Sequence, residues 1–175
     1  FEHDDDDYSP LPQEKYRQLA LSSVNTHDLP PTLAYLRGDH ISLRAHLGVL
    51  TRSVEEEQRD DIEWQARVLA TVADRGLLPQ RDYLVDPAER ASRGAEEDIS
   101  EALHRYIVGT PSALAYTSLV DMVGDVRAQN QPGTTHDLYP NWCVPLCDTN
   151  GAPLLIEDLP SLEFFQRLEA TSRKA

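Results

Sequence analysis

The stretch LALSSVNTHD, residues 19–28, is followed directly by LPP, residues 29–31. It starts as a short apolar run, which predicts a buried strand, and it ends on polar residues. The two prolines prevent an immediate continuation as helix. His27 and Asp28 are therefore expected at the carboxyl end of a strand. In β/α barrels the active site is built at this end, because the strand is rigid and the following loop is free to hold ligand.

The composition indicates a globular domain with a core. The chain has 175 residues, of which 40% are hydrophobic and 7% aromatic, too polar a mixture for a fibrous or membrane-embedded protein. Its 30 acidic and 16 basic residues leave a net charge of -14, which repels nucleic acid and anionic membranes. No apolar stretch approaches the roughly 20 residues of a membrane helix, and residues 1–12 are acidic, unlike a signal peptide. We therefore expect no nucleic-acid or membrane partner and a cytoplasmic location.

Two cysteines, Cys143 and Cys147, lie close together in the sequence. No second Cys or His pair occurs at zinc-finger spacing. Reduced thiols with a structural role are favoured, and a local disulfide or a metal site are the alternatives. We expect neither a metal nor a cofactor.

Several segments carry apolar residues at helical spacing between Gly or Pro residues. The longest begins at Ser53, where three glutamates favour a helix N-terminus, and extends to Gly76. A second buried strand is predicted over residues 112–120, followed by a single turn over 121–124. The remaining predicted helices cover residues 32–38, 41–47, 96–108 and 160–171, and residues 79–93 are expected to form an exposed connection. This order of elements indicates α/β architecture.

Two irregular segments are expected to be loops. Residues 1–12 carry four consecutive aspartates before Pro10 and Pro12, which favours an exposed acidic loop, and residues 13–18 are expected to form one short helical turn that leads into the strand. A calcium site would need spaced oxygen ligands and a glycine turn, and this segment has neither. Residues 129–145 are rich in proline, glycine, amides and aromatic rings, which favours a loop that contacts a ligand.

Three short motifs occur in order along the chain: THDLPPT at residues 26–32, NQPGT at 130–134 and YPNW at 139–142. GLLP at 76–79 and SEALHRYIVGTPSAL at 100–114 accompany them. Together they resemble the 4-α-glucanotransferases, which are also called amylomaltases or disproportionating enzymes. The resemblance extends from residue 19 to about residue 168.

The resemblance implies an α/β fold that is the C-terminal part of a (β/α)8 TIM-type barrel, because members of this family are much longer than this chain. Residues 19–25 would form the seventh strand and residues 113–120 the eighth, so the chain would be incomplete on its own. Residues 1–175 would be a single C-terminal segment of the catalytic barrel, with residues 1–18 as an acidic, proline-rich loop within it. The implied partner is the N-terminal remainder of the barrel.

The resemblance also implies retaining transfer of α-1,4-glucan segments between maltooligosaccharides. Asp28 matches the catalytic carboxylate that stabilises the transition state, and His27 would donate to a hydroxyl of the same sugar. Asn130 would contact this sugar, and Pro132 and Gly133 would shape the backbone around it. The family's nucleophile Asp and acid/base Glu have no matching motif here. The chain alone is therefore expected to be inactive.

Several of these residues, and others, also have interpretations in which they do not take part in catalysis. Without the resemblance, His27 and Asp28 would be a surface histidine and a capping carboxylate. The pair at residues 136–137 has the same appearance and is expected to be solvated loop. His104 is expected to pack beside its helix, and Trp142 to be structural.

Two further points bear on function. Pro31 is an additional residue relative to the commoner THDLPT form of the motif. The alternative function is a non-catalytic sugar-binding or interaction module derived from the same scaffold. An unrelated serine or cysteine hydrolase is disfavoured, because no Gly-x-Ser-x-Gly elbow occurs.

Overall fold

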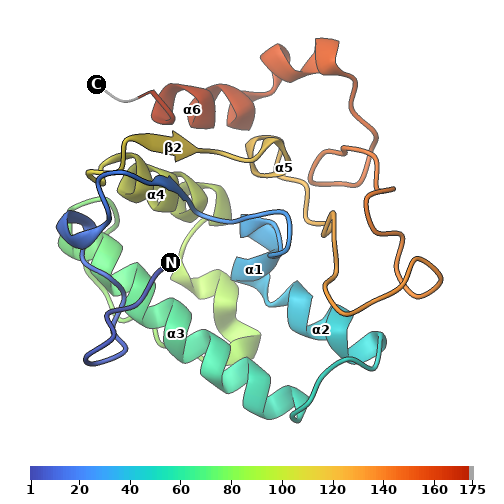
Figure 1. The fold of residues 1–175 in the computed structure, drawn as a ribbon, viewed down its shortest axis with the longest axis horizontal. Coiled ribbons are helices and arrows are strands. Elements are labelled where there is room, and N and C mark those ends of the chain that lie inside the picture. The colour runs from blue at the N-terminus through green and yellow to red at the C-terminus, as the bar shows by residue number, and fades with distance from the viewer. Residues whose placement is uncertain (174–175) are drawn as a thin grey trace.

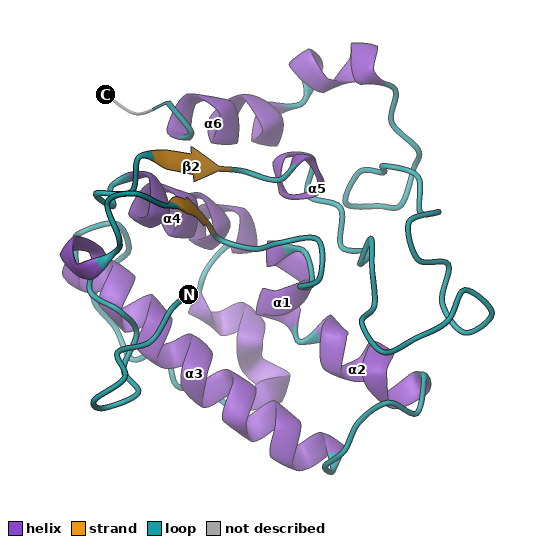
Figure 2. Cartoon of the chain, in the orientation of Figure 1, coloured by secondary structure: helices purple, strands orange, loops and turns teal. Residues whose placement is uncertain are grey.

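The computed structural model describes residues 1–173, and helices make up most of its regular structure (Figure 1). A short pair of strands lies against them (Figure 2). None of the helices in the described range is long and apolar enough to span a bilayer. In chain order the elements are the 3-10 helix η1 (Gln13–Lys15), β1 (Leu21–Ser23), α1 (Thr32–Arg37), α2 (Asp39–His46), α3 (Val54–Asp74), η2 (Pro87–Arg93), α4 (Glu96–Val108), β2 (Leu114–Tyr116), α5 (Leu119–Met122), η3 (Ile156–Ser161) and α6 (Glu163–Thr171).

The two strands pair in parallel, with Leu21 opposite Leu114 and Ser23 opposite Tyr116. Helices α1 to α4 form the long connection that parallel pairing requires, so the predicted α/β architecture is confirmed (Figure 1). Residues on a strand alternate between the two faces. Ser22 is buried, whereas Leu21 and Leu114 are each 63% exposed. Within the described residues the sheet therefore has one covered face and one uncovered apolar face.

The prediction of two buried strands is accordingly wrong for the uncovered face. Both strands are also shorter than the apolar runs that predicted them. The physical reason is that the apolar character of a strand indicates only that its faces can be buried, and among residues 1–173 nothing packs against this face. Leu19, the first residue of the predicted strand, is almost fully exposed.

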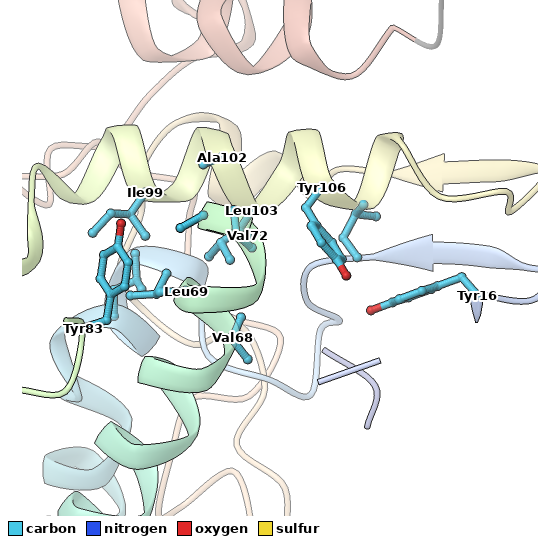
Figure 3. Packing of buried hydrophobic residues seen from close by; sticks show 12 residues of the cluster. Tyr16, Val68, Leu69, Val72, Tyr83, Ile99, Ala102, Leu103 and Tyr106 are labelled. Carbon is cyan, nitrogen blue, oxygen red and sulfur yellow. The ribbon is translucent and has the colours of Figure 1, made fainter. Parts of the chain in front are cut away.

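The main core lies between α3 and α4, and Figure 3 shows their side chains meeting. Both helices were predicted from apolar residues at spacings of three and four, and all of these residues except Ala66 are buried, as is Val68. Burial of one such side chain contributes roughly 1.5–3 kcal/mol, so this helix pair carries much of the stability. The residues concerned are Val68, Leu69 and Val72 of α3 and Ile99, Leu103 and Tyr106 of α4.

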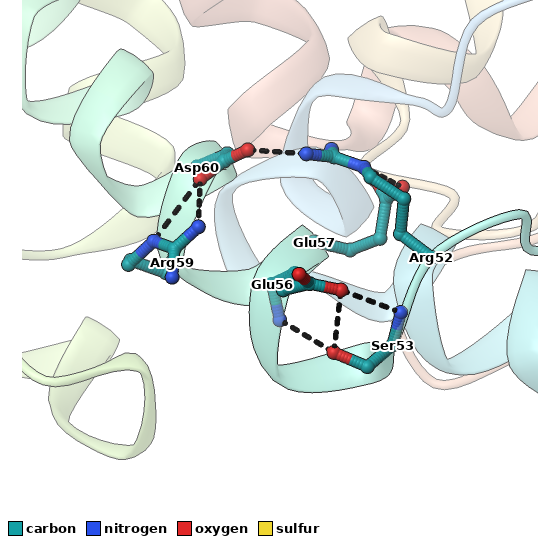
Figure 4. Close-up of polar contacts among 6 residues, drawn as sticks. All are labelled: Arg52, Ser53, Glu56, Glu57, Arg59 and Asp60. Carbon is teal, nitrogen blue, oxygen red and sulfur yellow. Dashed lines mark hydrogen bonds and ion pairs between the residues drawn. The ribbon is translucent and has the colours of Figure 1, made fainter.

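Helix α3 begins with a capping box, shown in Figure 4. The Glu56 N–H donates to Ser53 Oγ at 3.2 Å, and the Glu56 carboxylate accepts from the Ser53 N–H at 3.1 Å. Two backbone donors that lack helical partners are satisfied in this way. Arg52 adds ion pairs to Glu57 and Asp60 on the surface of the first turns. The box explains why the helix starts where the sequence predicted.

Ser53→Ala is expected to destabilise the start of α3 by about 1 kcal/mol, because the Glu56 N–H loses its acceptor. A synthetic peptide covering residues 51–76 should lose helix content, measured by circular dichroism. Ser53→Asp, which keeps a capping oxygen, is the matched control and should retain the helix content. Equal helix content in the Ala and Asp peptides would contradict the role of the cap.

Two segments predicted as exposed are partly buried. Residues 79–93 were expected to form an exposed connection, but η2 buries Arg90 and Arg93. Arg93 donates to the Leu36 carbonyl at 2.6 Å and to Gln65 Oε1 at 2.7 Å, so these buried donors are paired. Burial lowers the pKa of Arg93 to about 10.

Residues 1–12 were expected to form an exposed loop and residues 13–18 a short helical turn, and η1 confirms the turn. Asp5 to Asp7 are exposed, but Tyr16 is buried and the Phe1 ring lies 5.3 Å from the ring of Tyr106. Aromatic rings thus tie the ends of the acidic loop to the core. The final helix begins at Glu163 and not at residue 160, because Pro160 lies within the 3-10 turn of η3.

Candidate functional site

Asp28 and Asn130 meet although 102 residues separate them. Asp28 lies in the loop after β1, and Asn130 lies in the loop after α5. The Asn130 Nδ2 donates to Asp28 Oδ1 at 2.6 Å. The Asp28 side chain is 51% exposed. One carboxylate oxygen is therefore held by the amide, while the group still reaches solvent.

His27 lies beside the other carboxylate oxygen. Its Nε2 is 3.4 Å from Asp28 Oδ2, and its side chain is 60% exposed. The imidazole ring is also close to an aromatic neighbour, with 5.0 Å between the centroids of His27 and Trp142. The structure thus groups residues from all three motifs, THDLPPT, NQPGT and YPNW, at one place.

The loop that carries Asp28 is fixed at both ends. The Leu29 N–H donates to the Thr26 carbonyl at 3.1 Å, which closes a turn around the histidine and the aspartate. Beyond the prolines, Thr32 donates from its backbone N–H and from Oγ1 to the buried carboxylate of Asp121, at 2.7 and 2.9 Å. Asp121, which lies within α5, thereby anchors the first turn of α1.

The base of the loop that carries Asn130 is held by a second buried carboxylate, Asp125. It accepts from Arg127 at 3.0 and 2.8 Å and from the Cys147 N–H at 3.0 Å. The hydrogen bonds that Arg127 donates to Asp125 raise the pKa of Arg127, which therefore stays cationic. Arg127 also donates to the Pro145 carbonyl at 2.5 Å. Both ends of this loop are therefore tied to one ion pair.

Hydrogen bonds also organise the tip of this loop. Asn141 Oδ1 accepts from the Gln131 N–H at 2.7 Å, and the Trp142 N–H donates to the Gln129 carbonyl at 2.8 Å. Tyr139 donates its hydroxyl to the Ala128 carbonyl at 2.6 Å. Burial raises the pKa of Tyr139, which keeps this donor protonated. The segment has no regular secondary structure, as predicted, yet side chains hold its two sides together.

Pro132 and Gly133 lie exposed at the tip of the loop. Gly133 has φ +81°, a conformation that glycine adopts without strain, and a Cβ there would meet nothing within 4 Å. Its contribution is therefore the turn itself. Trp142 has φ +63° although it is a bulky residue, and its indole is 63% exposed. Trp142 was expected to be structural, but its ring is not packed in a core among the described residues.

The remaining histidines differ from His27 in their surroundings. His136 is exposed, as is its neighbour Asp137. His104 is buried, in agreement with the packing expected for it, with Nδ1 2.8 Å from the Ser100 carbonyl and Nε2 3.5 Å from Asp121 Oδ2. Because a carbonyl only accepts, Nδ1 carries the proton.

A cavity of about 960 Å³ adjoins the site. Asp28, Asn130 and Pro132 line it together with many apolar side chains, among them Leu36 and Trp64. This combination of a largely apolar wall and a few convergent polar groups is typical of ligand sites. Within residues 1–173 no group of His, Cys, Asp or Glu is arranged to hold a metal ion. Cys143 and Cys147 are free thiols, so the alternative of a local disulfide is excluded.

Sequence reasoning missed the residues that hold the site in place. Asp121, Asp125 and Asn141 each bind backbone groups of a loop that carries a motif residue. Asn141 lies in the YPNW motif, which is the one signal that could have identified it. The two aspartates stand in no motif, and the backbone N–H groups that they bind, those of Thr32 and Cys147, lie 89 and 22 residues away.

Comparison with known proteins gives a consistent result. The sequence model of the 4-alpha-glucanotransferase family matches residues 1–149. The 4-alpha-glucanotransferases of Mycobacterium bovis and Mycobacterium tuberculosis are each 46% identical over 170 residues, which cover 95% of this chain and 21% of the relative. The crystal structure of amylomaltase from Corynebacterium glutamicum matches 100% of this chain and 25% of its own, with a TM-score of 0.95 and 49% identity. The chain thus spans about a fifth to a quarter of the length of these relatives.

Proposed function

Because the chain belongs to the 4-alpha-glucanotransferase family, we propose that it is the C-terminal part of an enzyme that transfers α-1,4-glucan segments between maltooligosaccharides. The observation that carries the proposal is the hydrogen bond between Asn130 and Asp28, which joins two motifs from distant parts of the sequence. In retaining transfer, a carboxylate attacks the anomeric carbon, an acid protonates the leaving oxygen, and an acceptor sugar then attacks the glycosyl-enzyme.

Asp28 is the transition-state stabiliser in this proposal. Positive charge develops at the anomeric carbon, and a nearby carboxylate that binds ring hydroxyls stabilises that charge. Its half-exposed position, with Asn130 holding Oδ1, supports this role. His27, 3.4 Å away, donates to a hydroxyl of the same sugar. Pro132 and Gly133 shape the turn next to Asn130.

The nucleophile and the acid/base lie outside this chain in the proposal, on earlier strands of a (β/α)8 barrel. β1 and β2 are its seventh and eighth strands, and residues 1–175 are one segment of that barrel, with residues 1–18 as the loop before the seventh strand. The uncovered apolar face supports this arrangement, because a closed barrel has an interior filled by side chains that would cover the exposed Leu21 and Leu114.

The alternative, a sugar-binding module without chemistry, requires that the chain be stable alone. The parallel strand pair exposes apolar side chains, and its outer edges have no partner among the described residues. Both features favour aggregation of such a module. The same features are explained at once if further strands complete the sheet. The catalytic proposal therefore accounts for more of the structure.

The test compares the 175-residue chain with a complete enzyme that contains it. With maltotriose as substrate, the complete enzyme is expected to produce glucose and longer maltooligosaccharides, and the chain alone to produce neither. Chromatography of the products distinguishes transfer from hydrolysis, since hydrolysis forms no longer sugars. Turnover by the chain alone would contradict the placement of the nucleophile outside it, and a complete enzyme without transfer activity would contradict the function.

A further inference from the structure

Trp142 presents its indole to solvent although it belongs to the loop that holds Asn130. The indole is 63% exposed, and the backbone has φ +63°, a conformation that costs energy in a bulky residue. The N–H of the same residue is bound to the Gln129 carbonyl. The described residues leave most of this ring uncovered, and its backbone holds a strained conformation of the kind that clusters at ligand sites.

The surroundings of this ring are those of a sugar site. The indole centroid lies 5.0 Å from that of His27, which itself lies beside Asp28. Hydrogen bonds on either side of Asn130, from Gln131 to Asn141 and from Trp142 to Gln129, hold the two sides of the loop together. Three polar side chains and one aromatic ring thus lie in a row, in the order Asn130, Asp28, His27 and Trp142.

We infer that the Trp142 indole is a stacking platform for a glucose unit of the glucan, adjacent to the unit that Asp28 and His27 bind. A pyranose ring presents C–H groups on its faces and hydroxyls at its edge. When a sugar stacks on an exposed indole, the apolar face of the sugar is removed from water, while neighbouring polar groups bind its edge hydroxyls. The inference deepens the proposed function and rests on it, because it specifies where the neighbouring sugar of the same glucan lies.

The experiment measures transfer kinetics with maltotriose and longer maltooligosaccharides in the complete enzyme. Trp142→Ala is expected to raise KM about 10-fold with little change in kcat, because the platform binds the ground state and the transition state equally. Trp142→Phe, which keeps an aromatic face, should restore most of the affinity. Trp142→Leu, which keeps apolar volume without a flat ring, should not.

Tyr8 provides a matched control. It is 62% exposed, has φ +58° and stacks on a histidine, His3, with 4.0 Å between the ring centroids, but no Asp–Asn pair adjoins it. Tyr8→Ala should therefore leave KM unchanged.

Each outcome has one meaning. If Leu restores KM as well as Phe does, the ring has a packing role and the inference is overturned, even where the Ala variant does not fold. A wild-type KM in Trp142→Ala also overturns it. If the wild-type enzyme transfers glucan and Trp142→Ala has no effect, only the stacking role of Trp142 is disproved. If the wild-type enzyme does not transfer glucan, the proposed function itself is disproved.

Discussion

Asp28→Asn in the complete enzyme is expected to lower kcat for glucan transfer by about 10³-fold or more, with a much smaller change in KM. The substitution keeps the size of the side chain but replaces a full negative charge by a dipole. Asn130 donates its amide to Oδ1, so an amide at position 28 turns its own oxygen toward Asn130 and its NH₂ toward the sugar. A donor then faces the developing positive charge. Initial rates with maltotriose measure the effect.

Two companion variants make this test specific. His27→Ala should lower the rate by roughly 10- to 100-fold, since it removes one hydrogen bond in the transition state. Asp137→Asn removes a carboxylate that also follows a histidine, in an exposed stretch between the NQPGT and YPNW motifs, and should leave kcat unchanged. Near-normal rates in Asp28→Asn would refute the assignment of Asp28.

The helical part of the fold could be predicted from the sequence because its determinants are local. In α3 and α4, apolar residues recur along one face, and a capping box or an acidic first turn marks each start. Such signals lie within one or two turns of the residues that they organise. The extents of both helices agree with the prediction to within two residues at each end.

The burial of charged residues could not be predicted in this way. Arg93 contacts Gln65 and Leu36, which are 28 and 57 residues away, and Arg90 pairs with Asp61 at 2.7 Å. An arginine in an irregular segment gives no indication that distant acceptors will enclose it. The exposed connection predicted over residues 79–93 was wrong for this reason.

In the candidate site, too, some features could be predicted from the sequence and others could not. The position of Asp28 after a strand follows from a local pattern, the end of an apolar run before prolines. Its pairing with Asn130 follows from the order of motifs and not from the physical properties of either residue alone. The supports of the two loops, Asp121 and Asp125, become visible only once the chain has folded, because each joins segments that the sequence keeps apart.

Asp121 is the residue whose loss is expected to destabilise the protein most. Its buried carboxylate accepts from the Thr32 N–H and hydroxyl, and His104 Nε2 lies 3.5 Å from it. In Asp121→Ala the Thr32 N–H and hydroxyl lose their acceptor while remaining inside the protein. Each buried donor left without an acceptor costs about 1–3 kcal/mol, so the two Thr32 donors together cost roughly 2–6 kcal/mol, more than the net gain of making their bonds.

Hydrogen exchange in the complete enzyme provides a local measurement of this cost. In Asp121→Ala the Thr32 amide should exchange at least about 100-fold faster, since each 1.4 kcal/mol of local stability corresponds to roughly a factor of ten. Thr32→Val is the matched control: it removes one hydroxyl bond but keeps the N–H bond to Asp121 at 2.7 Å, so protection should fall by only about 10-fold. Because Thr32 begins the helix directly after the Asp28 loop, kcat should fall in Asp121→Ala and remain close to wild type in Thr32→Val. Equal exchange rates in the two variants would show that the carboxylate does not anchor this loop.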